Sequence, residues 1–222
     1  MLRELEPVRD PRLGQVFTPA AVADLVLSLT LAGAPVGASL LDPACGDGVF
    51  LARALARGID PLRLVGFDVD SAAVVAARDH APGCLISRGD FFQVPLVMRE
   101  AVVGNPPYVR QELLGAQAKR QIAGCLAADW PEIARPYWER LMGRSDLAAA
   151  FIARSLRFLP EGGRLGFVLS QAALEAGYWE GLRRFLAERA NVLAVVSSPA
   201  ERWFADAAIH GVIVILERRT NG

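Results

Sequence analysis

The stretch SLLDPACGDG, at residues 39–48, joins a short apolar run to a turn with two glycines. Residues 39–41 predict a buried strand, and the apolar residues from Val49 to about Arg57 predict a helix. Strand, glycine turn and helix together open a nucleotide-binding βαβ unit, in which the helix N-terminus offers free N–H groups to a ligand. We expect Gly46 and Gly48 to let that ligand approach the backbone.

The acidity of this turn indicates what kind of ligand it binds. A dinucleotide pattern requires a third glycine at the helix start, and Leu51 occupies that place. Asp42 and Asp47 would also repel a pyrophosphate. An acidic turn favours a cationic ligand without phosphates, and the sulfonium and ammonium groups of S-adenosylmethionine meet this requirement. The pattern therefore disfavours a dehydrogenase.

Acidic residues also end the next two predicted strands. The strand at Leu64–Asp68 ends twenty residues after Gly48, where an acid that binds a ribose diol is expected. The strand at residues 84–87 is followed by Asp90 and two phenylalanines, Phe91 and Phe92, which could bond and stack an adenine ring. Asp90 could equally cap a turn, and we expect one of the two phenylalanines to belong to the core.

The stretch VGNPPY, at residues 103–108, predicts a rigid corner after a fourth strand. Each proline fixes φ and lacks an N–H, so the corner can join neither a sheet ladder nor a helix interior. Asn105 is kept out of helical angles because a proline follows it. Ligands bind at the carboxyl ends of parallel strands, so the corner would present an amide, a carbonyl and the Tyr108 ring beside the cofactor site. The alternative is a simple turn with a surface tyrosine.

Helices and strands alternate over the rest of the chain. Further strands are predicted at residues 164–169, 191–197 and 211–216, and further helices at residues 172–187 and after caps at Thr18 and Ser145. The last two strands follow each other through a loop, so we predict that they are antiparallel. The whole chain, residues 1–222, is predicted to form one α/β domain with an N-terminal arm at residues 1–13.

Composition limits the environment and the partners. The chain is 53% hydrophobic, enough for a large core, but no apolar run reaches the length of a membrane span. Its three widely spaced cysteines suggest neither a disulfide framework nor a metal site, and they fit a reducing cytoplasm. The net charge is zero, which argues against tight DNA binding by the chain alone but allows a local basic face.

Residues 110–144 are predicted to form a helical insertion whose role the pattern leaves open. The insertion could be a mobile substrate flap that follows the corner, or a helical pair packed on the sheet. Positive charge is concentrated here, either on a binding face or on a solvated helix face. The basic residues are Arg110, Lys119, Arg120, Arg135, Arg140 and Arg144.

In their order along the chain, these motifs resemble those of the gamma-class N6-adenine DNA methyltransferases of restriction–modification systems. The resemblance extends over residues 14–217. The family's motif X matches residues 14–19, motif I residues 42–48, motif II Asp68, motif III Asp90 and Phe91, the catalytic motif IV residues 105–108, and motif VIII the loop with Trp203 and Phe204. The position of motif X before all the others is typical of the gamma class.

The resemblance implies a Rossmann-like fold that binds S-adenosylmethionine. Its seven-stranded mixed sheet has an antiparallel last strand and helices on both faces. The residues that would hold the cofactor follow from the motif positions. Phe17, Thr18, Asp42, Ala44 and Gly46 would surround the methionine end, Asp68 would hold the ribose hydroxyls, Asp90 the adenine amino group and Phe91 the adenine face.

The resemblance also implies methyl transfer to N6 of an adenine that has been flipped out of DNA. The Asn105 side-chain oxygen and the Pro106 carbonyl would each accept one amino hydrogen, on a corner that Pro107 keeps rigid. These fixed acceptors localise the nitrogen lone pair, so no strong base is required. Tyr108 would stack on the base, and Phe204 would pack against its other face or edge.

Three other expectations accompany this resemblance. Amino-methyltransferases that act on a protein glutamine or on RNA guanine also use Asn-Pro-Pro-Tyr, although the Phe17-Thr18 element and the Phe204 loop favour DNA adenine. A non-catalytic cofactor-binding subunit is a second possibility, against which the intact Asn105 and Tyr108 argue. Finally, gamma-class enzymes carry a target-recognition domain after motif VIII or borrow one from a specificity subunit, so we expect a partner or a longer protein to supply recognition.

Overall fold

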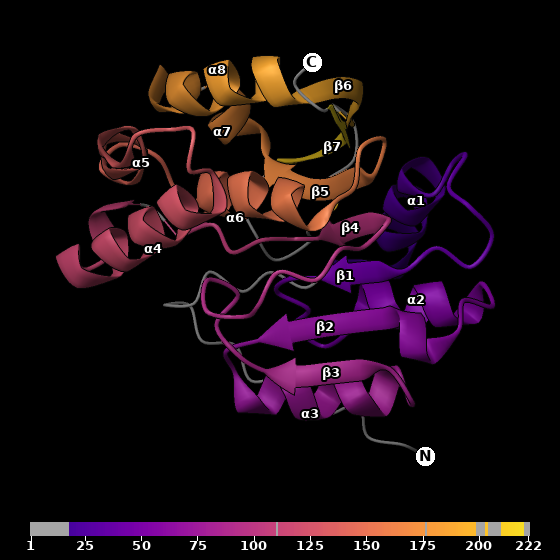
Figure 1. The fold of residues 1–222 in the computed structure, drawn as a ribbon. Coiled ribbons are helices and arrows are strands. Elements are labelled where there is room, and N and C mark those ends of the chain that lie inside the picture. Colours follow the sequence, from indigo (N-terminus) through magenta and orange to yellow (C-terminus); the bar gives the residue numbers. More distant parts are fainter. Residues whose placement is uncertain (1–17, 110, 176, 199–202, 204–209, 220–222) are drawn as a thin grey trace.

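A seven-stranded sheet forms the centre of the computed structural model, which describes residues 18–109, 111–175, 177–198, 203 and 210–219 (Figure 1). The strands are β1 (Leu40–Asp42), β2 (Leu64–Asp68), β3 (Leu85–Arg88), β4 (Ala101–Gly104), β5 (Arg164–Ser170), β6 (Ala190–Ser197) and β7 (Gly211–Arg218). Their order is β3-β2-β1-β4-β5-β7-β6. Strands β1 to β5 pair in parallel, and β7 is antiparallel to both β5 and β6, which confirms the predicted mixed sheet.

The order of the strands creates a switch point beside β1. The chain places β2 on one side of β1 and β4 on the other, with Leu41 aligned to Val65 and to Val102. At such a point the connections leave in opposite directions, and a crevice opens beyond the carboxyl ends of the strands. The four turns that carry the sequence motifs, after β1, β2, β3 and β4, all begin at this edge.

Helices cover both faces of the sheet, as predicted. The helices are α1 (Ala20–Thr30), α2 (Val49–Ala56), α3 (Ser71–His80), α4 (Ala116–Asp129), α5 (Arg135–Met142), α6 (Leu147–Ser155), α7 (Gln171–Glu175) and α8 (Glu180–Arg189). Helices α1 to α3 contribute to one core cluster, and α4, α5, α6 and α8 to the other. Strand residues alternate between the two clusters: Ala101 and Val103 belong to the first and Val102 to the second.

Two of the predicted helix caps were wrong by one residue. The N-cap of α1 is Pro19 rather than Thr18, and no side chain caps this helix. Asp146 rather than Ser145 caps α6, because its carboxylate accepts a hydrogen bond from the Ala149 N–H at 3.2 Å. Thr18 is buried, and its hydroxyl accepts a hydrogen bond from the Asn105 side chain instead of capping the helix. Tertiary contacts therefore decide which of two neighbouring residues becomes the cap.

The helix predicted at residues 172–187 is broken into three parts. Helix α7 ends at Glu175, a 3-10 turn η5 follows at Gly177–Trp179, and α8 begins at Glu180. Glycine is a weak helix former, and the break lets the Trp179 indole turn inward. Trp179 is buried and donates a hydrogen bond to Asp146 Oδ1 at 3.2 Å, so the break ties this segment to the start of α6.

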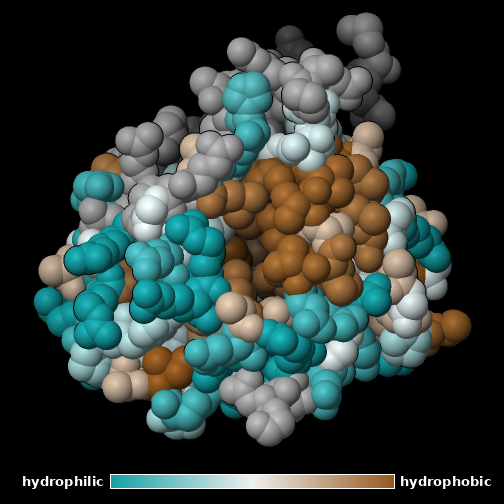
Figure 2. All heavy atoms as spheres, turned by 90° about the horizontal axis from the view of Figure 1, so that it is seen from above, coloured by the Kyte–Doolittle hydropathy of each residue, from teal (hydrophilic) through white to brown (hydrophobic). Residues whose placement is uncertain are grey.

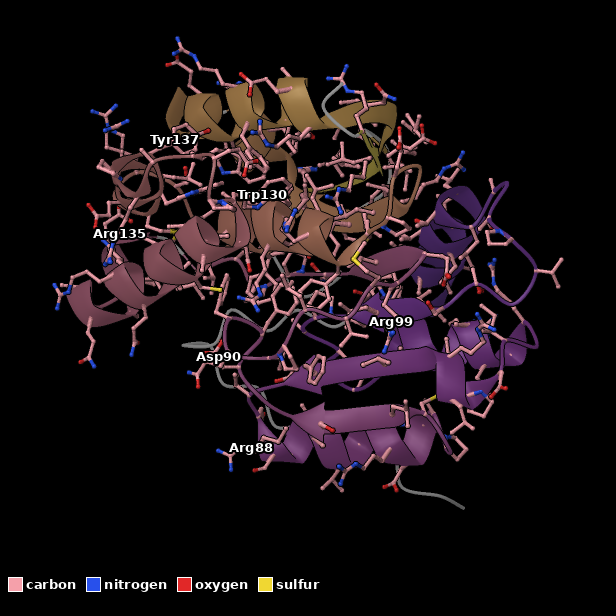
Figure 3. All side chains as sticks on the ribbon, viewed as in Figure 1. Arg88, Asp90, Arg99, Trp130, Arg135 and Tyr137 are labelled. Carbon is pink, nitrogen blue, oxygen red and sulfur yellow. The ribbon has the colours of Figure 1, made fainter. Side chains whose placement is uncertain are left out.

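Helices α4 and α5 pack into the second core cluster. Trp130 and Trp138 are both buried, and the Trp130 indole donates a hydrogen bond to the Ala153 carbonyl of α6 at 3.2 Å. Trp130 therefore joins the α4–α5 pair to α6, close to the middle of the view in Figure 3.

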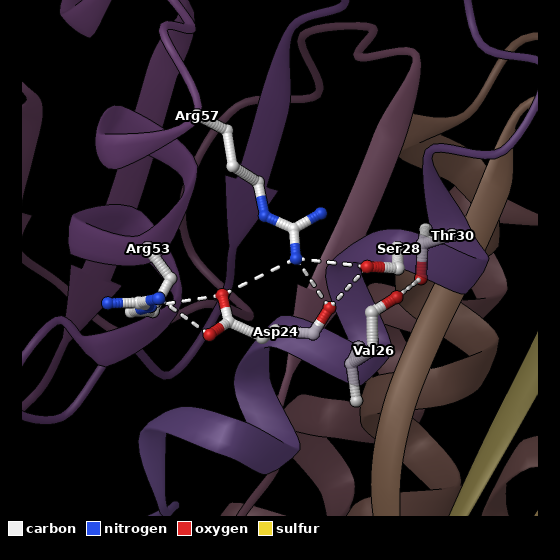
Figure 4. A network of polar contacts seen from close by, with 6 residues as sticks. All are labelled: Asp24, Val26, Ser28, Thr30, Arg53 and Arg57. Carbon is white, nitrogen blue, oxygen red and sulfur yellow. Dashed lines mark hydrogen bonds and ion pairs between the residues drawn. The ribbon is translucent and has the colours of Figure 1, made fainter.

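An arginine pair fastens α1 to α2 (Figure 4). Arg53 of α2 donates two hydrogen bonds to the Asp24 carboxylate, at 3.0 and 2.6 Å. Arg57 reaches the Asp24 carbonyl at 2.7 Å and the Ser28 hydroxyl at 3.0 Å. These bonds fix the helix that begins just after Thr18, so they help to hold Thr18 in its position at the sheet edge. None of the described helices is long and apolar enough to cross a membrane.

Candidate active site

A cavity of about 480 Å³ lies at the carboxyl edge of the sheet. Each motif-bearing turn contributes to its wall: Ala44 and Gly46 follow β1, Asp68 ends β2, Asp90 follows β3, and Asn105 follows β4. This volume is within the range of sites for small molecules and cofactors. The structure thus brings together residues from four turns, which lie along the left side of the sheet in Figure 1.

The cavity is acidic. Four carboxylates line it, those of Asp47, Asp68, Asp70 and Asp90, and the described lining residues include no lysine, arginine or histidine. Burial raises the pKa of Asp47 and of Asp68, so a cation in the cavity would stabilise their charged forms. This wall suits a cationic ligand and opposes a phosphate, in agreement with the acidic turn in the sequence.

Asp42 lies behind the wall of the cavity rather than on it. Its side chain is fully buried, and Oδ1 accepts a hydrogen bond from the Ala44 N–H at 3.2 Å. Among the described residues, Oδ2 has no hydrogen-bond partner. Burial, with a further contribution from Asp68 and Asp47, raises the pKa of Asp42 well above its ordinary value. A buried carboxylate with one orphaned oxygen, set just behind the cavity, fits a site for a cation.

Asp68 joins the turns after β1 and β2. Its Oδ2 accepts a hydrogen bond from the Gly46 N–H at 2.8 Å, and its Oδ1 accepts one from the Asp70 N–H at 2.9 Å. Each carboxylate oxygen has a second lone pair, which is available for a diol in the cavity. The two backbone bonds fix the orientation of the carboxylate at the cavity wall.

The two glycines of the first turn have different surroundings. A Cβ on Gly46 would meet open space, and Gly46 lines the cavity. A Cβ on Gly48 would lie 2.9 Å from the Ala77 Cα of α3, and Gly48 is not part of the cavity wall. Gly48 has a left-handed φ of 83° at the N-cap of α2. Its structural role is therefore close packing of α2 against α3.

The missing third glycine of the turn has a counterpart in β2. Leu51 is fully buried, and a Cβ on Gly66 would lie 2.7 Å from Leu51 Cδ1. In dinucleotide sites the glycine that permits close packing of helix and strand is on the helix. Here the small residue is on the strand and the large one on the helix, which gives the same close packing with the roles exchanged.

Asp90 and Phe91 are held by local contacts. Asp90 Oδ1 accepts a hydrogen bond from the Phe92 N–H at 2.9 Å, and Oδ2 accepts one from the Gln93 side chain at 3.0 Å. Phe91 is 1% exposed and stacks on Phe151 with ring centroids 5.2 Å apart. Both Asp90 and Phe91 nevertheless contribute atoms to the cavity wall. Asp90 is thus a turn former and also a lining residue, and Phe91 supports the wall from within the core.

At the Asn-Pro-Pro-Tyr corner, both ends of a carboxamide are hydrogen-bonded. Asn105 Nδ2 donates to the Thr18 hydroxyl oxygen at 3.2 Å, and Asn105 Oδ1 accepts from the Tyr108 hydroxyl at 2.5 Å. The Tyr108 hydroxyl also lies 3.1 Å from the Val168 carbonyl oxygen of β5. A hydroxyl has one hydrogen, so these two acceptors are alternatives for it. Burial and the nearby Asp146 raise the pKa of Tyr108, which keeps the phenol protonated and able to donate.

An apolar wall that the sequence patterns did not indicate completes the cavity. It consists of side chains from the 3-10 turn η3 (Gln111–Leu113), from the residue that follows it, from α4 and from α6: Leu113, Leu114, Ile122, Leu147 and Phe151. Leu147 and Phe151 lie on α6, which the sequence predicted as a helix, but no pattern placed them beside the Asn-Pro-Pro-Tyr corner. Phe17 and Phe204, predicted to contact the cofactor and the base, lie outside the described residues.

Solved structures show which fold this chain has. A protein from Listeria monocytogenes assigned to the class I S-adenosylmethionine-dependent methyltransferases superposes with a TM-score of 0.72 at 19% identity, over 96% of this chain and 63% of that one. A type I restriction–modification methyltransferase subunit from Streptococcus thermophilus superposes with a TM-score of 0.69 at 20% identity, over 93% of this chain and 46% of that one. The fold is that of the S-adenosylmethionine-dependent methyltransferases.

Sequence comparisons identify the family within this class. Residues 1–78 match the N-6 DNA methylase family, and residues 100–204 match the Eco57I restriction-modification methylase family. The type II methyltransferase M.PaeR7I from Pseudomonas aeruginosa is 30% identical over 94% of this chain and 41% of its own length. The chain belongs to the N6-adenine methyltransferases of restriction–modification systems, and it corresponds to their catalytic domain. It spans about two fifths of the length of that relative.

Proposed function

We propose that this chain transfers a methyl group from S-adenosylmethionine to the N6 amino group of an adenine flipped out of DNA. The observation that carries the proposal is the position of Asn105, which lines the acidic cavity at the switch point of the sheet and whose carboxamide is bonded to another lining residue, Thr18. The family and the fold support the same chemistry.

The cavity residues fit the cofactor on physical grounds. S-adenosylmethionine is cationic at its sulfonium and ammonium groups, and the cavity carries four carboxylates with the orphaned oxygen of Asp42 behind them. In this proposal Thr18, Asp42, Ala44 and Gly46 surround the methionine end and Asp68 holds the ribose. When bound, the cofactor supplies an electrophilic methyl group on sulfur.

Asn105 and Pro106 act on the amino group of the target. An exocyclic amino group is a poor nucleophile because its lone pair is delocalised into the ring. The Asn105 Oδ1 and the Pro106 carbonyl accept its two hydrogens, which draws the nitrogen towards tetrahedral geometry and localises the lone pair. Fixed acceptors of this kind contribute through preorganisation, and loss of one such group costs about 10²- to 10³-fold in rate.

The proposal requires Tyr108 to change partner. Its hydroxyl occupies Asn105 Oδ1 in this structure, at 2.5 Å, and that oxygen must be free to accept a hydrogen from adenine. The Val168 carbonyl at 3.1 Å offers an alternative acceptor, so the ring needs little movement to release Asn105. With its hydroxyl on Val168, Tyr108 can present its ring to the flipped base, and Phe204 would contact the base from another side.

Recognition of a DNA sequence is proposed to come from a target-recognition domain or a specificity subunit. The net charge of zero supports this, because a self-sufficient DNA-binding domain is usually basic. The catalytic domain would then supply the chemistry and the pocket for the base, and its partner would supply the register on DNA.

The test is transfer of labelled methyl from S-adenosylmethionine to adenine-containing duplex DNA, with Asn105→Ala as the matched control. We expect incorporation at N6 that the variant loses, while calorimetry shows that the variant still binds the cofactor. Equal incorporation by Asn105→Ala would contradict the proposed mechanism. Release factor and ribosomal RNA in parallel reactions cover the other amino-group substrates, and incorporation into either of these instead of DNA would contradict the proposed substrate.

A further inference from the structure

A second cavity lies between α5 and α8, about 400 Å³ in volume, and its charge is opposite to that of the first. Arg140, Arg144 and Arg184 line it, together with one acidic residue, Glu180. All four side chains are exposed, and Tyr137 closes one side by donating a hydrogen bond to the Gly181 carbonyl at 2.6 Å. In a chain with zero net charge, this is a local concentration of cationic groups around a hollow.

The arginines of this cavity are available for a ligand. Arg184 forms an ion pair with Glu180 at 3.0 Å, but both side chains are largely exposed, so the pair is weak and can exchange. No ion pair or side-chain hydrogen bond holds the Arg140 or Arg144 guanidinium to any other residue in the described part of the chain. Guanidinium groups present planar, forked donors that match the oxygens of a phosphate.

The basic cavity is connected to the catalytic corner through two hydrogen bonds. Trp179 ends the turn that contributes Gly177 to the cavity, and its indole donates to Asp146 at 3.2 Å. The next residue, Leu147, donates its N–H to the Val109 carbonyl at 3.0 Å, directly after Tyr108. Arg144 precedes Asp146 by two residues, which places its Cα within about 8 Å of the Asp146 Cα. Figure 3 shows Tyr137 and Arg135 on the same side of the molecule as Asp90, whereas Arg99 lies towards the other ends of the strands.

We propose that this basic cavity binds a backbone phosphate of the DNA strand that carries the target adenine. The inference rests on the proposed function and adds to it the place where the nucleic-acid backbone is held. Phosphate contacts fix the position of a protein on DNA without reading its sequence, and a flipped nucleotide needs its neighbouring backbone anchored. Arg140, Arg144 and Arg184 hold the phosphate, and the acidic first cavity excludes it, so the two cavities separate the backbone from the cofactor.

The test compares DNA binding by the chain and by Arg144→Gln, Arg184→Gln and Arg99→Gln, using fluorescence anisotropy of a labelled duplex across a salt series. Arg99→Gln removes the same charge at the opposite edge of the sheet. We expect Arg144→Gln and Arg184→Gln each to weaken binding about 2- to 5-fold. Each should also lower the slope of log Kd against log salt by about 1. Arg99→Gln should change neither. Equal effects of all three variants, or no effect of the first two, would overturn the proposal.

A second measurement covers weak binding. The side-chain Nε–Hε signals of Arg140, Arg144 and Arg184 are followed by NMR during titration with the same duplex and with an RNA duplex of the same sequence. We expect these signals to shift with DNA. Absence of any shift, or a stronger response to RNA, would overturn the assignment to DNA. Cofactor binding by calorimetry shows that each variant is folded.

The two proposals can fail separately. Suppose that the chain methylates adenine but that Arg144→Gln and Arg184→Gln bind DNA as Arg99→Gln does. This result would refute the phosphate site and leave the proposed function intact. Suppose instead that Arg144→Gln and Arg184→Gln weaken DNA binding but that the unaltered chain transfers no methyl group. This result would leave the phosphate site intact and refute the proposed function for this chain.

Discussion

Asn105 is held at both ends of its carboxamide, and this fixes the orientation of the side chain. Thr18 Oγ1 accepts from the nitrogen end, so the oxygen end is directed towards Tyr108. Thr18 is thus a positioning residue for Asn105 as well as a lining residue of the cavity. The contact joins residues 87 positions apart, and no local pattern around either of them reveals it.

Replacement of Thr18 tests this positioning role. We expect Thr18→Val to lower kcat about 2- to 10-fold, because the Asn105 amide loses one hydrogen bond and samples other orientations. Thr18→Ser keeps the hydroxyl and should retain the rate. Steady-state kinetics should show the effect in kcat more than in KM for DNA. A purely structural role would instead lower the melting temperature with kcat unchanged.

Tyr108 has two separable parts, a ring and a hydroxyl. Tyr108→Phe removes the competitor for Asn105 Oδ1 and keeps the stacking surface, so we expect kcat/KM to be retained or raised. Tyr108→Ala also removes the ring and should cost about 1–3 kcal/mol in transition-state stabilisation. Kinetics of the two variants distinguish the parts. A large loss in Tyr108→Phe would show that the hydroxyl itself takes part in the reaction.

Asp42 links the site to stability. Its pKa is raised in the folded protein by burial, so the folded state disfavours the charged form and loses stability as pH rises above the unfolded pKa of about 3.9. Asp42→Asn does not titrate. We therefore expect the variant to gain stability relative to the unaltered chain as pH rises from about 4 towards the folded-state pKa of Asp42. Urea unfolding of both proteins at several pH values measures this difference, and a constant difference would contradict it.

At the scale of the elements, the sequence predicted strands better than helix ends. The bounds of β2 are those expected, and those of β1 and β3 differ by one residue at each end. Apolar runs bounded by charged residues, glycine or proline define buried parallel strands well, because both faces must be apolar. Helix caps and the break at Gly177 depend on partners that are distant in sequence, such as Asp146 for Trp179. The apolar wall of the cavity escaped prediction for the same reason.

The close packing of α2 on β2 gives a prediction about Gly66 in β2, with Gly124 in α4 as the matched control. A Cβ at Gly66 would lie 2.7 Å from Leu51 and 3.1 Å from Cys45 Sγ, whereas a Cβ at Gly124 in α4 would meet no atom within 4 Å. We expect Gly66→Ala to destabilise the fold by about 1–3 kcal/mol through overpacking. Gly124→Ala should instead stabilise it by about 0.4–1 kcal/mol, through helix propensity and a less flexible unfolded chain. Urea denaturation of both variants would show the opposite signs, and similar effects would refute the packing argument.

At the scale of the whole molecule, binding of the cofactor should stabilise the fold. A ligand that binds only the folded state at 100 times its Kd adds about 2.7 kcal/mol to the free energy of unfolding. We expect S-adenosylmethionine to raise the melting temperature of the unaltered chain and of Asn105→Ala. Asp68→Ala should lose most of this rise, because it removes the proposed ribose ligand. Scanning calorimetry with and without the cofactor measures the rise in melting temperature. An undiminished rise in Asp68→Ala would contradict the proposed role of Asp68 as the ribose ligand.

The upper edge of the sheet is apolar. Seen from above, the molecule has a continuous patch of hydrophobic side chains, and β6 lies at this edge (Figure 2). Three large residues of β6 are exposed, Val192, Leu193 and Val195.

The place of β7 in the sheet sets the timing of folding during synthesis. Strand β6 is made before β7 but lies outside it, because β7 inserts between β5 and β6. Until residues 211–218 have left the ribosome, β5 has no neighbour on that side, and β6 has no strand to pair with. Before β7 is made, the nascent chain therefore carries one open edge on β5 and an unpaired β6, and such edges are prone to wrong pairing. Strand β7, which is translated after the other six strands, is thus the one that completes the sheet.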